Sequence, residues 1–212
     1  MIVRNINNYG IKNLLIMFFY EIIYCFDSRY RSQVFYDESV TNKYDEIKNK
    51  TGLRKNNTRT YNAPYSPTPI YFLILIKDFL KNFNTKNYYF IDFGCGAGRS
   101  ILFFKNLFKK KLGIDFNQEY KKFFKNKNFI SLNLRNSNSI KLIKKKYKFN
   151  NYILYFYEPF DETLIMNIIK NFLPKKLIII LINVKKIKLS NLKLTFSKEF
   201  KNHSKNIRIY QN

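Results

Sequence analysis

A short run of alternating glycines constrains this chain more than any other feature of its 212 residues. Residues 88–93 are apolar apart from Asp92, and Gly94-Cys-Gly-Ala-Gly98 follows them directly. An apolar sequence resumes at residues 100–104. The pattern predicts a buried strand, a tight loop and a helix. Such a loop lets the backbone approach a ligand where a Cβ atom would collide, and it places free helix N–H groups beside that ligand. The alternative is a glycine loop that only turns the chain.

The spacing of the glycines differs from the dinucleotide-binding fingerprint G-x-G-x-x-G. Gly98 comes one residue early, and Arg99 occupies the last position of the fingerprint. A second apolar stretch, residues 111–115, ends on Asp115, 17 residues after Gly98. An acid at this point of a Rossmann-like βαβ unit binds both hydroxyls of a ribose. Alternatively, Asp115 is the N-cap of a following helix.

The run Asp92-x-Gly94-x-Gly96-x-Gly98 resembles motif I of class I S-adenosylmethionine (SAM) methyltransferases. The resemblance implies a Rossmann-like fold with SAM as the cofactor. It also implies that Asp92 lies near the methionine ammonium of SAM and that Asp115 binds the ribose. The loop residues expected to contact the cofactor are Gly94, Cys95, Gly96 and Gly98.

From residue 88 onward, apolar runs of strand length alternate with amphipathic or basic stretches of helix length. This alternation predicts an α/β fold with a doubly wound, mostly parallel sheet. The predicted strands are 88–93, 111–115, 128–133, 151–156 and 177–183. The predicted helices between them are 97–108, 118–126, 139–147 and 162–172. Methyltransferases of this class end in an antiparallel hairpin, which we expect here at residues 192–196 and 207–210.

Residues 1–60 lack this alternation, and we expect them to form an N-terminal helical and extended cap on a single domain of residues 61–212. Helices are predicted at residues 11–26 and 70–80. Residues 61–69 contain three prolines and are therefore expected to be largely extended. This segment either folds over the ligand site or is a rigid connector.

The fourth predicted strand leads into Tyr157, Glu158, Pro159 and Phe160. Because ligands of open α/β sheets bind beyond the carboxyl ends of the strands, we expect Tyr157, Glu158 and Phe160 to face the glycine loop. The segment partly resembles the Asn/Asp-Pro-Pro-Tyr/Phe motif of amino-group methyltransferases, with one proline missing and Glu158 in place of Asn or Asp. The implied catalytic roles are acceptor orientation or deprotonation by Glu158 and contact by Tyr157 and Phe160. The alternative is a turn with an acid before a helix.

The same family often has an acid after the third strand that binds the adenine amino group. Residues 133–137 contain no acid, but Asn133 and Asn136 have side chains that form hydrogen bonds. We take Asn136 as the candidate cofactor-binding residue and keep Asn133 as the alternative.

The chain has 39 Lys and Arg residues against 14 Asp and Glu, which gives a formal net charge of +25. Such a charge attracts polyanions, so weak nucleic-acid binding through the basic surface is expected. A compositional cause competes with a functional one, because Lys, Asn, Ile, Phe and Tyr all have codons rich in A and T. The lysines occur in every segment, which favours a dispersed charge over a clustered one.

Cys25 and Cys95 are too few for a disulfide framework or a zinc site, and His203 is the only histidine. We therefore expect no metal, and we disfavour Cys95 as a nucleophile because no histidine lies near it in sequence. The apolar residues 14–26 are shorter than a membrane span and include Glu21. No signal-peptide cleavage pattern follows them, so we expect a cytoplasmic protein.

These features together predict SAM-dependent methyl transfer to an acceptor that the sequence leaves open. A non-catalytic SAM-binding or nucleic-acid-binding module on the same fold is the first alternative. A nicotinamide enzyme is the second, and the glycine spacing argues against it.

Overall fold

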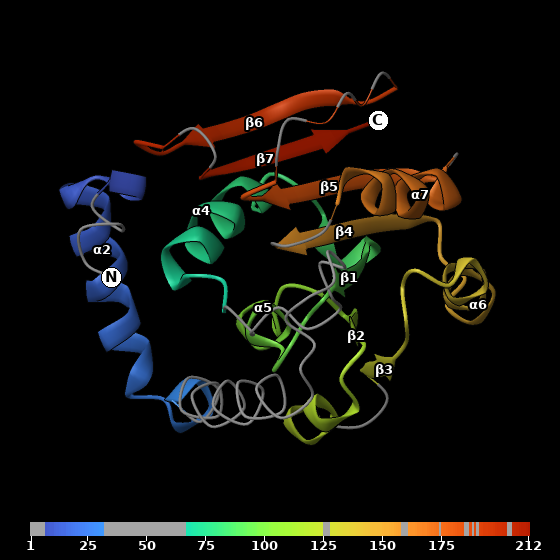
Figure 1. Ribbon diagram of the computed structural model, residues 1–212, viewed down its shortest axis with the longest axis horizontal. Coiled ribbons are helices and arrows are strands. Elements are labelled where there is room, and N and C mark those ends of the chain that lie inside the picture. The colour runs from blue at the N-terminus through green and yellow to red at the C-terminus, as the bar shows by residue number, and fades with distance from the viewer. Residues whose placement is uncertain are drawn as a thin grey trace, which may run out of the picture.

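The computed structural model describes residues 7–31, 67–124, 128–157, 161–173, 175–184, 187, 189, 191–202 and 205–212. These residues form a seven-stranded sheet with the strand order β3-β2-β1-β4-β5-β7-β6 (Figure 1). The strands are β1 (Tyr89–Phe93), β2 (Lys110–Asp115), β3 (Phe129–Ser131), β4 (Asn151–Tyr157), β5 (Lys176–Ile182), β6 (Lys193–Glu199) and β7 (Asn206–Gln211).

The first five strands pair in parallel, and β7 runs antiparallel to both β5 and β6. The chain proceeds outward from β1 through β2 to β3 and then returns to β4 on the other side of β1. The carboxyl ends of β1 and β4 therefore lie side by side at a topological switch point, where open α/β sheets bind ligands. This topology confirms the predicted fold class, including the C-terminal hairpin.

Helices cover both faces of the sheet. They are α2 (Ile11–Cys25), α4 (Ile70–Leu80), α5 (Arg99–Phe103), α6 (Ser137–Lys146) and α7 (Glu162–Phe172), with short 3₁₀ helices η2 (Thr85–Asn87) and η3 (Gln118–Phe123). Side chains of α4 and α5 share one buried cluster with the sheet, and those of α6 and α7 share another. In Figure 1, α6 and α7 lie near the tails of β4 and β5, and α2 lies on the side to which the arrowheads of these two strands point.

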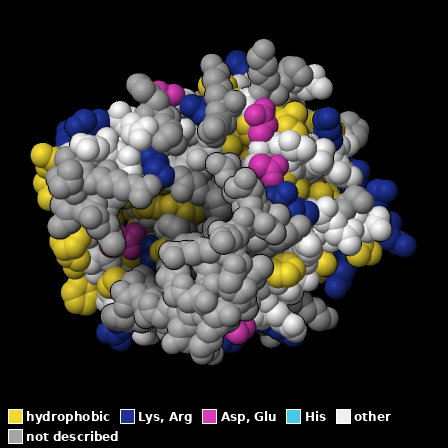
Figure 2. Space-filling view, in the orientation of Figure 1, with side chains coloured by type: hydrophobic (Ala, Val, Ile, Leu, Met, Phe, Trp, Pro, Cys, Tyr) yellow, Lys and Arg dark blue, Asp and Glu magenta, His cyan; other side chains and the backbone are white. Residues whose placement is uncertain are grey.

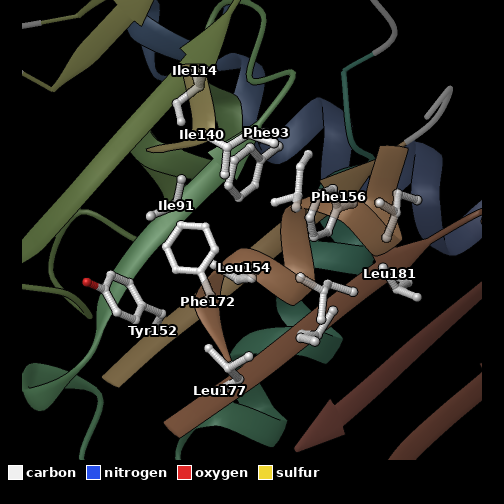
Figure 3. Close-up of a cluster of buried hydrophobic side chains, with 14 of the residues drawn as sticks. Ile91, Phe93, Ile114, Ile140, Tyr152, Leu154, Phe156, Phe172, Leu177 and Leu181 are labelled. Carbon is white, nitrogen blue, oxygen red and sulfur yellow. The ribbon is translucent and has the colours of Figure 1, made fainter. Parts of the chain in front are cut away.

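The alternation of side chains along each strand divides the core between these two faces. Ile91 and Phe93 of β1 belong to the α6/α7 cluster, whereas Phe90 belongs to the α4/α5 cluster. Figure 3 shows the α6/α7 cluster, in which Phe93 stacks on Phe156 with the ring centroids 4.9 Å apart. Both faces are thus buried, which fixes the register of the strands that carry the glycine loop.

The N-terminal helix α2 packs on the outside of α4. Met17, Tyr20 and Tyr24 contact the α4/α5 cluster, and Tyr20 stacks on Tyr71 of α4 with ring centroids 6.2 Å apart. The opposite side of α2 is apolar and exposed, and Figure 2 shows apolar side chains along this side of the molecule. None of the described helices is long and apolar enough to span a membrane.

Two predicted helices differ from the structure. The stretch 97–108 contains only α5, which begins after Gly98 in the left-handed conformation (φ 79°). In the described part of the stretch 118–126, residues 118–124, only η3 is present, and Phe124 after it has an extended backbone (φ −106°, ψ 131°). The third strand is also shorter than predicted, and no helix is present in the residues described between β5 and β6.

Candidate functional site

The glycine loop leaves the carboxyl end of β1 in a conformation that favours glycine. Gly94, Gly96 and Gly98 have φ angles of 74°, 51° and 79°, in the left-handed region where a Cβ atom is unfavourable. The backbone N–H groups of Gly94 and Cys95 both donate to Ile114 O, at 2.7 and 3.0 Å. These bonds fasten the loop to the end of the neighbouring strand β2.

Asp115, the last residue of β2, holds the loop from the other side. Its Oδ2 accepts a hydrogen bond from the Gly96 N–H at 2.9 Å, and its Oδ1 accepts one from the Asn117 N–H at 2.9 Å. Burial raises the pKa of the Asp115 carboxyl, and the backbone donors oppose that rise. The N-cap of η3 is Asn117, whose side chain accepts from the Glu119 N–H. The alternative role of Asp115 as that helix cap is therefore wrong.

Asp92 lies within β1, one residue before the strand ends, and its residue exposure is 3%. Ser100 Oγ of α5 donates a hydrogen bond to Asp92 Oδ2. Burial raises the pKa of Asp92 to about 7, and the Ser100 hydrogen bond opposes that rise. A bound cation beside this carboxylate would be stabilised by its negative charge.

Gly98 is required by packing as well as by backbone conformation. An added Cβ at Gly98 would lie 2.4 Å from the ring of Phe124, and one at Gly113 would lie 2.7 Å from the same ring. The ring of Phe124 thus fills the space between the loop and β2. This contact explains the extended backbone of Phe124 and gives Gly98 a structural role independent of any ligand.

Cys95 is buried in the loop, and its Sγ lies 3.5 Å from Gly96 O. Burial raises the pKa of the Cys95 thiol well above its ordinary value, with smaller contributions from Asp92 and Asp115. The thiol is therefore neutral at physiological pH and is unsuited to nucleophilic attack.

A partly buried ion pair connects the loop to the N-terminal helix. Arg99 Nη1 donates to Glu21 Oε2 of α2 at 2.8 Å and to Oε1 at 3.0 Å. Glu21 Oε1 also accepts from the Ile70 N–H at the start of α4, at 2.9 Å. Arg99 Nη1 further contacts Thr68 O at 3.4 Å, and the Tyr155 hydroxyl of β4 donates to Thr68 Oγ1 at 2.8 Å.

Sequence reasoning missed this connection. The available signal was a single acid, Glu21, in an otherwise largely apolar helix, since charged groups in such surroundings are usually paired. The contacts place the short segment 67–69 beside the glycine loop. Residues 61–66 lie outside the described residues, so the question of a lid or a connector stays as the sequence left it.

The predicted acceptor-side residues are only partly described. Tyr157 ends β4, which is the direct neighbour of β1, and it packs into the α4/α5 cluster with 9% of its surface exposed. Glu158 and Phe160 lie outside the described residues. The helix that follows is capped by Asp161, whose side chain accepts from the Leu164 N–H at 2.8 Å.

Asn136 and Asn133 both lie between β3 and α6. Asn136 is the N-cap of α6, and its Oδ1 accepts from the Asn138 N–H at 3.0 Å. Asn133 Oδ1 accepts from the Arg135 N–H at 3.0 Å. Each side chain thus uses its oxygen locally. The structure therefore brings Asp92, the glycine loop and Asp115 together, and it places Asn136 after the more distant strand β3.

The sequence matches no family model and no curated protein sequence. Its fold is shared with solved structures of low sequence identity. Protein yhhF of Escherichia coli, assigned as a methyltransferase, is 14% identical over 69% of this chain and 87% of yhhF, with a TM-score of 0.50. A hypothetical protein of Thermus thermophilus is 13% identical over 71% of this chain and 90% of its own, also with a TM-score of 0.50. The chain has the fold of the class I SAM-dependent methyltransferases.

Proposed function

We propose that this protein is a SAM-dependent methyltransferase. The observation that carries the proposal is the pair of carboxylates around the glycine loop: Asp92 in β1 and Asp115 at the end of β2, with Asp115 bonded to the Gly96 N–H. Both acids lie toward the carboxyl edge of the sheet, at the switch point between β1 and β4.

The residues present fit SAM chemically. The Asp115 carboxylate accepts the backbone N–H groups of Gly96 and Asn117 and also interacts with that of Phe116. A carboxylate has about four lone-pair sites, so it retains capacity for a ribose hydroxyl. The ionised form of Asp92 suits the positively charged methionine end. The N–H groups of Gly94, Cys95 and Gly96 are bonded within the protein, and the small size of these residues lets a ligand lie close to the loop. Asn136 is our candidate for the adenine: its Oδ1 accepts from the Asn138 N–H, so its amide N–H₂ group would donate to a ring nitrogen of the adenine.

SAM supplies an electrophilic methyl group, and transfer to a nucleophile is an in-line displacement. The task of the chain is to hold the acceptor in line and to exclude water, which supplies much of the rate enhancement without a strong base. We assign acceptor orientation or deprotonation to Glu158 and acceptor contact to Tyr157 and Phe160. Tyr157 ends β4, and the other two follow it in the sequence. Because β4 pairs with β1, the strand that leads into the glycine loop, this order supports these roles. A cytoplasmic location stays a prediction.

The test of the proposal is methyl transfer from SAM with a labelled methyl group to fractionated cell extract. If label appears in one fraction, and appears there only when active protein is present, the protein is an enzyme. Binding of SAM without transfer to any fraction favours the alternative, a non-catalytic module on the same fold. Displacement of SAM by a nicotinamide dinucleotide at equal concentration would favour the nicotinamide enzyme instead.

Glu158→Gln tests the acceptor side separately from the cofactor side. We expect unchanged SAM affinity and a loss of turnover on the order of 10²-fold, the low end for a positioned acid or base. Glu162→Gln, which changes an exposed acid in the first turn of α7, is the matched control. Equal turnover of Glu158→Gln and the parent at saturating SAM would reduce Glu158 to a turn residue.

A further inference from the structure

A basic pocket lies at the edge of the sheet opposite the candidate site. Its volume is about 910 Å³, and its lysines are Lys86, Lys141, Lys144, Lys145, Lys148 and Lys175. These residues come from the segments that precede β1, β4 and β5 and from α6. The pocket therefore lies at the amino ends of these strands. Strand β4 has seven residues, so the two edges are about 20 Å apart.

The charge of the basic pocket is uncompensated by its own lining, which includes no Asp or Glu among the described residues. Elsewhere in the described chain, cations do meet acids: Lys81 pairs with Asp78 at 2.7 Å and Arg135 pairs with Asp161 at 2.9 Å. Six ammonium groups around one hollow repel each other, and a bound polyanion would relieve that repulsion. The sequence predicted that the lysines are dispersed, but at the basic pocket the fold brings six of them together.

Helix electrostatics explain only part of this cluster. Lys144 and Lys145 lie in the last turn of α6, where cations interact favourably with the helix dipole. Lys141 lies earlier in α6, and Lys148 lies beyond its end. Lys86 and Lys175 come from distant parts of the chain and reach the pocket through the fold. Figure 2 shows Lys and Arg side chains along the side of the molecule where Figure 1 places α6.

The remaining lining adds amide and aromatic groups. Asn87, Asn150 and Asn151 line the pocket, and the Asn151 amide donates to Asn87 O at 3.1 Å, which joins the starts of β1 and β4. Phe149 is half-buried in the lining, and Lys110 Nζ lies 4.8 Å from its ring centroid, adding a seventh cation at the margin. Proteins bind single-stranded nucleic acids with lysines that contact phosphates, amides that contact base edges and aromatic rings on which bases stack.

We infer that the basic pocket binds single-stranded nucleic acid through its phosphates. The concave shape is unsuited to a flat membrane surface, and an acidic peptide would leave the amide and aromatic groups without a use. The volume of the hollow is at the upper limit of small-ligand pockets and accommodates more than one phosphate group. The inference does not depend on SAM binding, because the two sites are at opposite edges of the sheet.

The test uses fluorescence anisotropy of a labelled single-stranded RNA of mixed sequence, about 12 nucleotides long. The pocket variant is Lys141→Gln/Lys145→Gln/Lys148→Gln, all exposed positions. The control variant, Lys121→Gln/Lys193→Gln/Lys201→Gln, removes the same charge from exposed positions outside the pocket. Circular dichroism melts confirm that both variants fold, and Lys86→Gln/Lys175→Gln provides a second pocket variant from other segments.

We expect the pocket variant to lose about 10-fold or more in RNA affinity near 150 mM salt and the control less than about 2-fold. Between about 50 and 200 mM salt, the slope of log affinity against log salt should fall by about 2 in the pocket variant, the value for three lost phosphate contacts. Equal losses in both triple variants would overturn the inference in favour of dispersed charge. Absence of binding by the parent, or equal competition by polyglutamate, would also overturn it.

Discussion

The guanidinium of Arg99, directly after the glycine loop, donates two hydrogen bonds to the carboxylate of Glu21 in the N-terminal helix, at 2.8 and 3.0 Å. The Arg99 side chain is 4% exposed and the Glu21 side chain 31% exposed. The same carboxylate accepts the Ile70 N–H at the start of α4. The contact therefore joins α2, α4 and the loop through one acid.

Glu21→Ala should destabilise the protein by about 3–5 kcal/mol, because it leaves a buried guanidinium without its charged partner. Urea denaturation measures this loss. The control is Asp78→Ala, which breaks the exposed pair with Lys81 and should cost at most about 1 kcal/mol. Adding Arg99→Met to Glu21→Ala should recover part of the loss. Equal costs for Glu21→Ala and Asp78→Ala would show that the buried pair has no special role.

The raised pKa of Asp92, about 7, predicts a pH dependence of stability. The unfolded chain loses this proton near pH 4 and the folded protein near pH 7, so the folded state binds more protons in between. The contribution of Asp92 to the free energy of unfolding is therefore fully present below about pH 4. It falls as the pH rises toward 7, by up to about 4 kcal/mol. Asp92→Asn should remove that fall. Parallel pH profiles of urea denaturation for the parent and Asp92→Asn would contradict the burial of an ionisable Asp92.

Gly98→Ala should destabilise the protein by about 2–4 kcal/mol, from left-handed strain and from overlap with the Phe124 ring. Gly94→Ala is the matched control, because it carries a similar φ but no described atom lies within 4 Å of its added Cβ. Phe124→Leu should partly rescue Gly98→Ala in a double-mutant cycle. Simple additivity of the two changes in thermal melts would mean that the ring is not the obstacle.

Asp115→Ala should weaken SAM binding by about 1–3 kcal/mol, the cost of removing a charged hydrogen-bond acceptor. Isothermal titration calorimetry measures the affinity. The control is Asn117→Ala, which removes the neighbouring helix cap, should cost about 1 kcal/mol of stability and should leave SAM affinity unchanged. If both variants lost the same affinity, Asp115 would act only through the conformation of the loop.

The strand, the loop and the two acids around them follow from local sequence. Alternating glycines after an apolar run fix the loop, and parallel strands place Asp92 and Asp115 toward one edge. The switch point then follows from the order of strands and helices. What local sequence leaves out is contact between distant segments. Glu21 and Arg99 are 78 residues apart, and nothing near either residue specifies the other.

The same reason explains the missed conformation of Phe124 and the missed basic pocket. Residues 118–126 have a helical pattern, but glycines in two other segments leave room for the Phe124 ring, and its packing there overrides helix propensity. Lysines spread evenly along the chain become a cluster only when the fold brings the segments before β1, β4 and β5 together.

Calorimetric titration of the purified protein with SAM is the direct test of cofactor binding, and it suits a chain that has no tryptophan to report binding by fluorescence. We expect saturable heat at one site per chain, with S-adenosylhomocysteine competing for that site. A nicotinamide dinucleotide should not compete. Folded protein that gives no heat of binding at millimolar SAM would contradict the assignment of Asp92, the glycine loop and Asp115 as a SAM site.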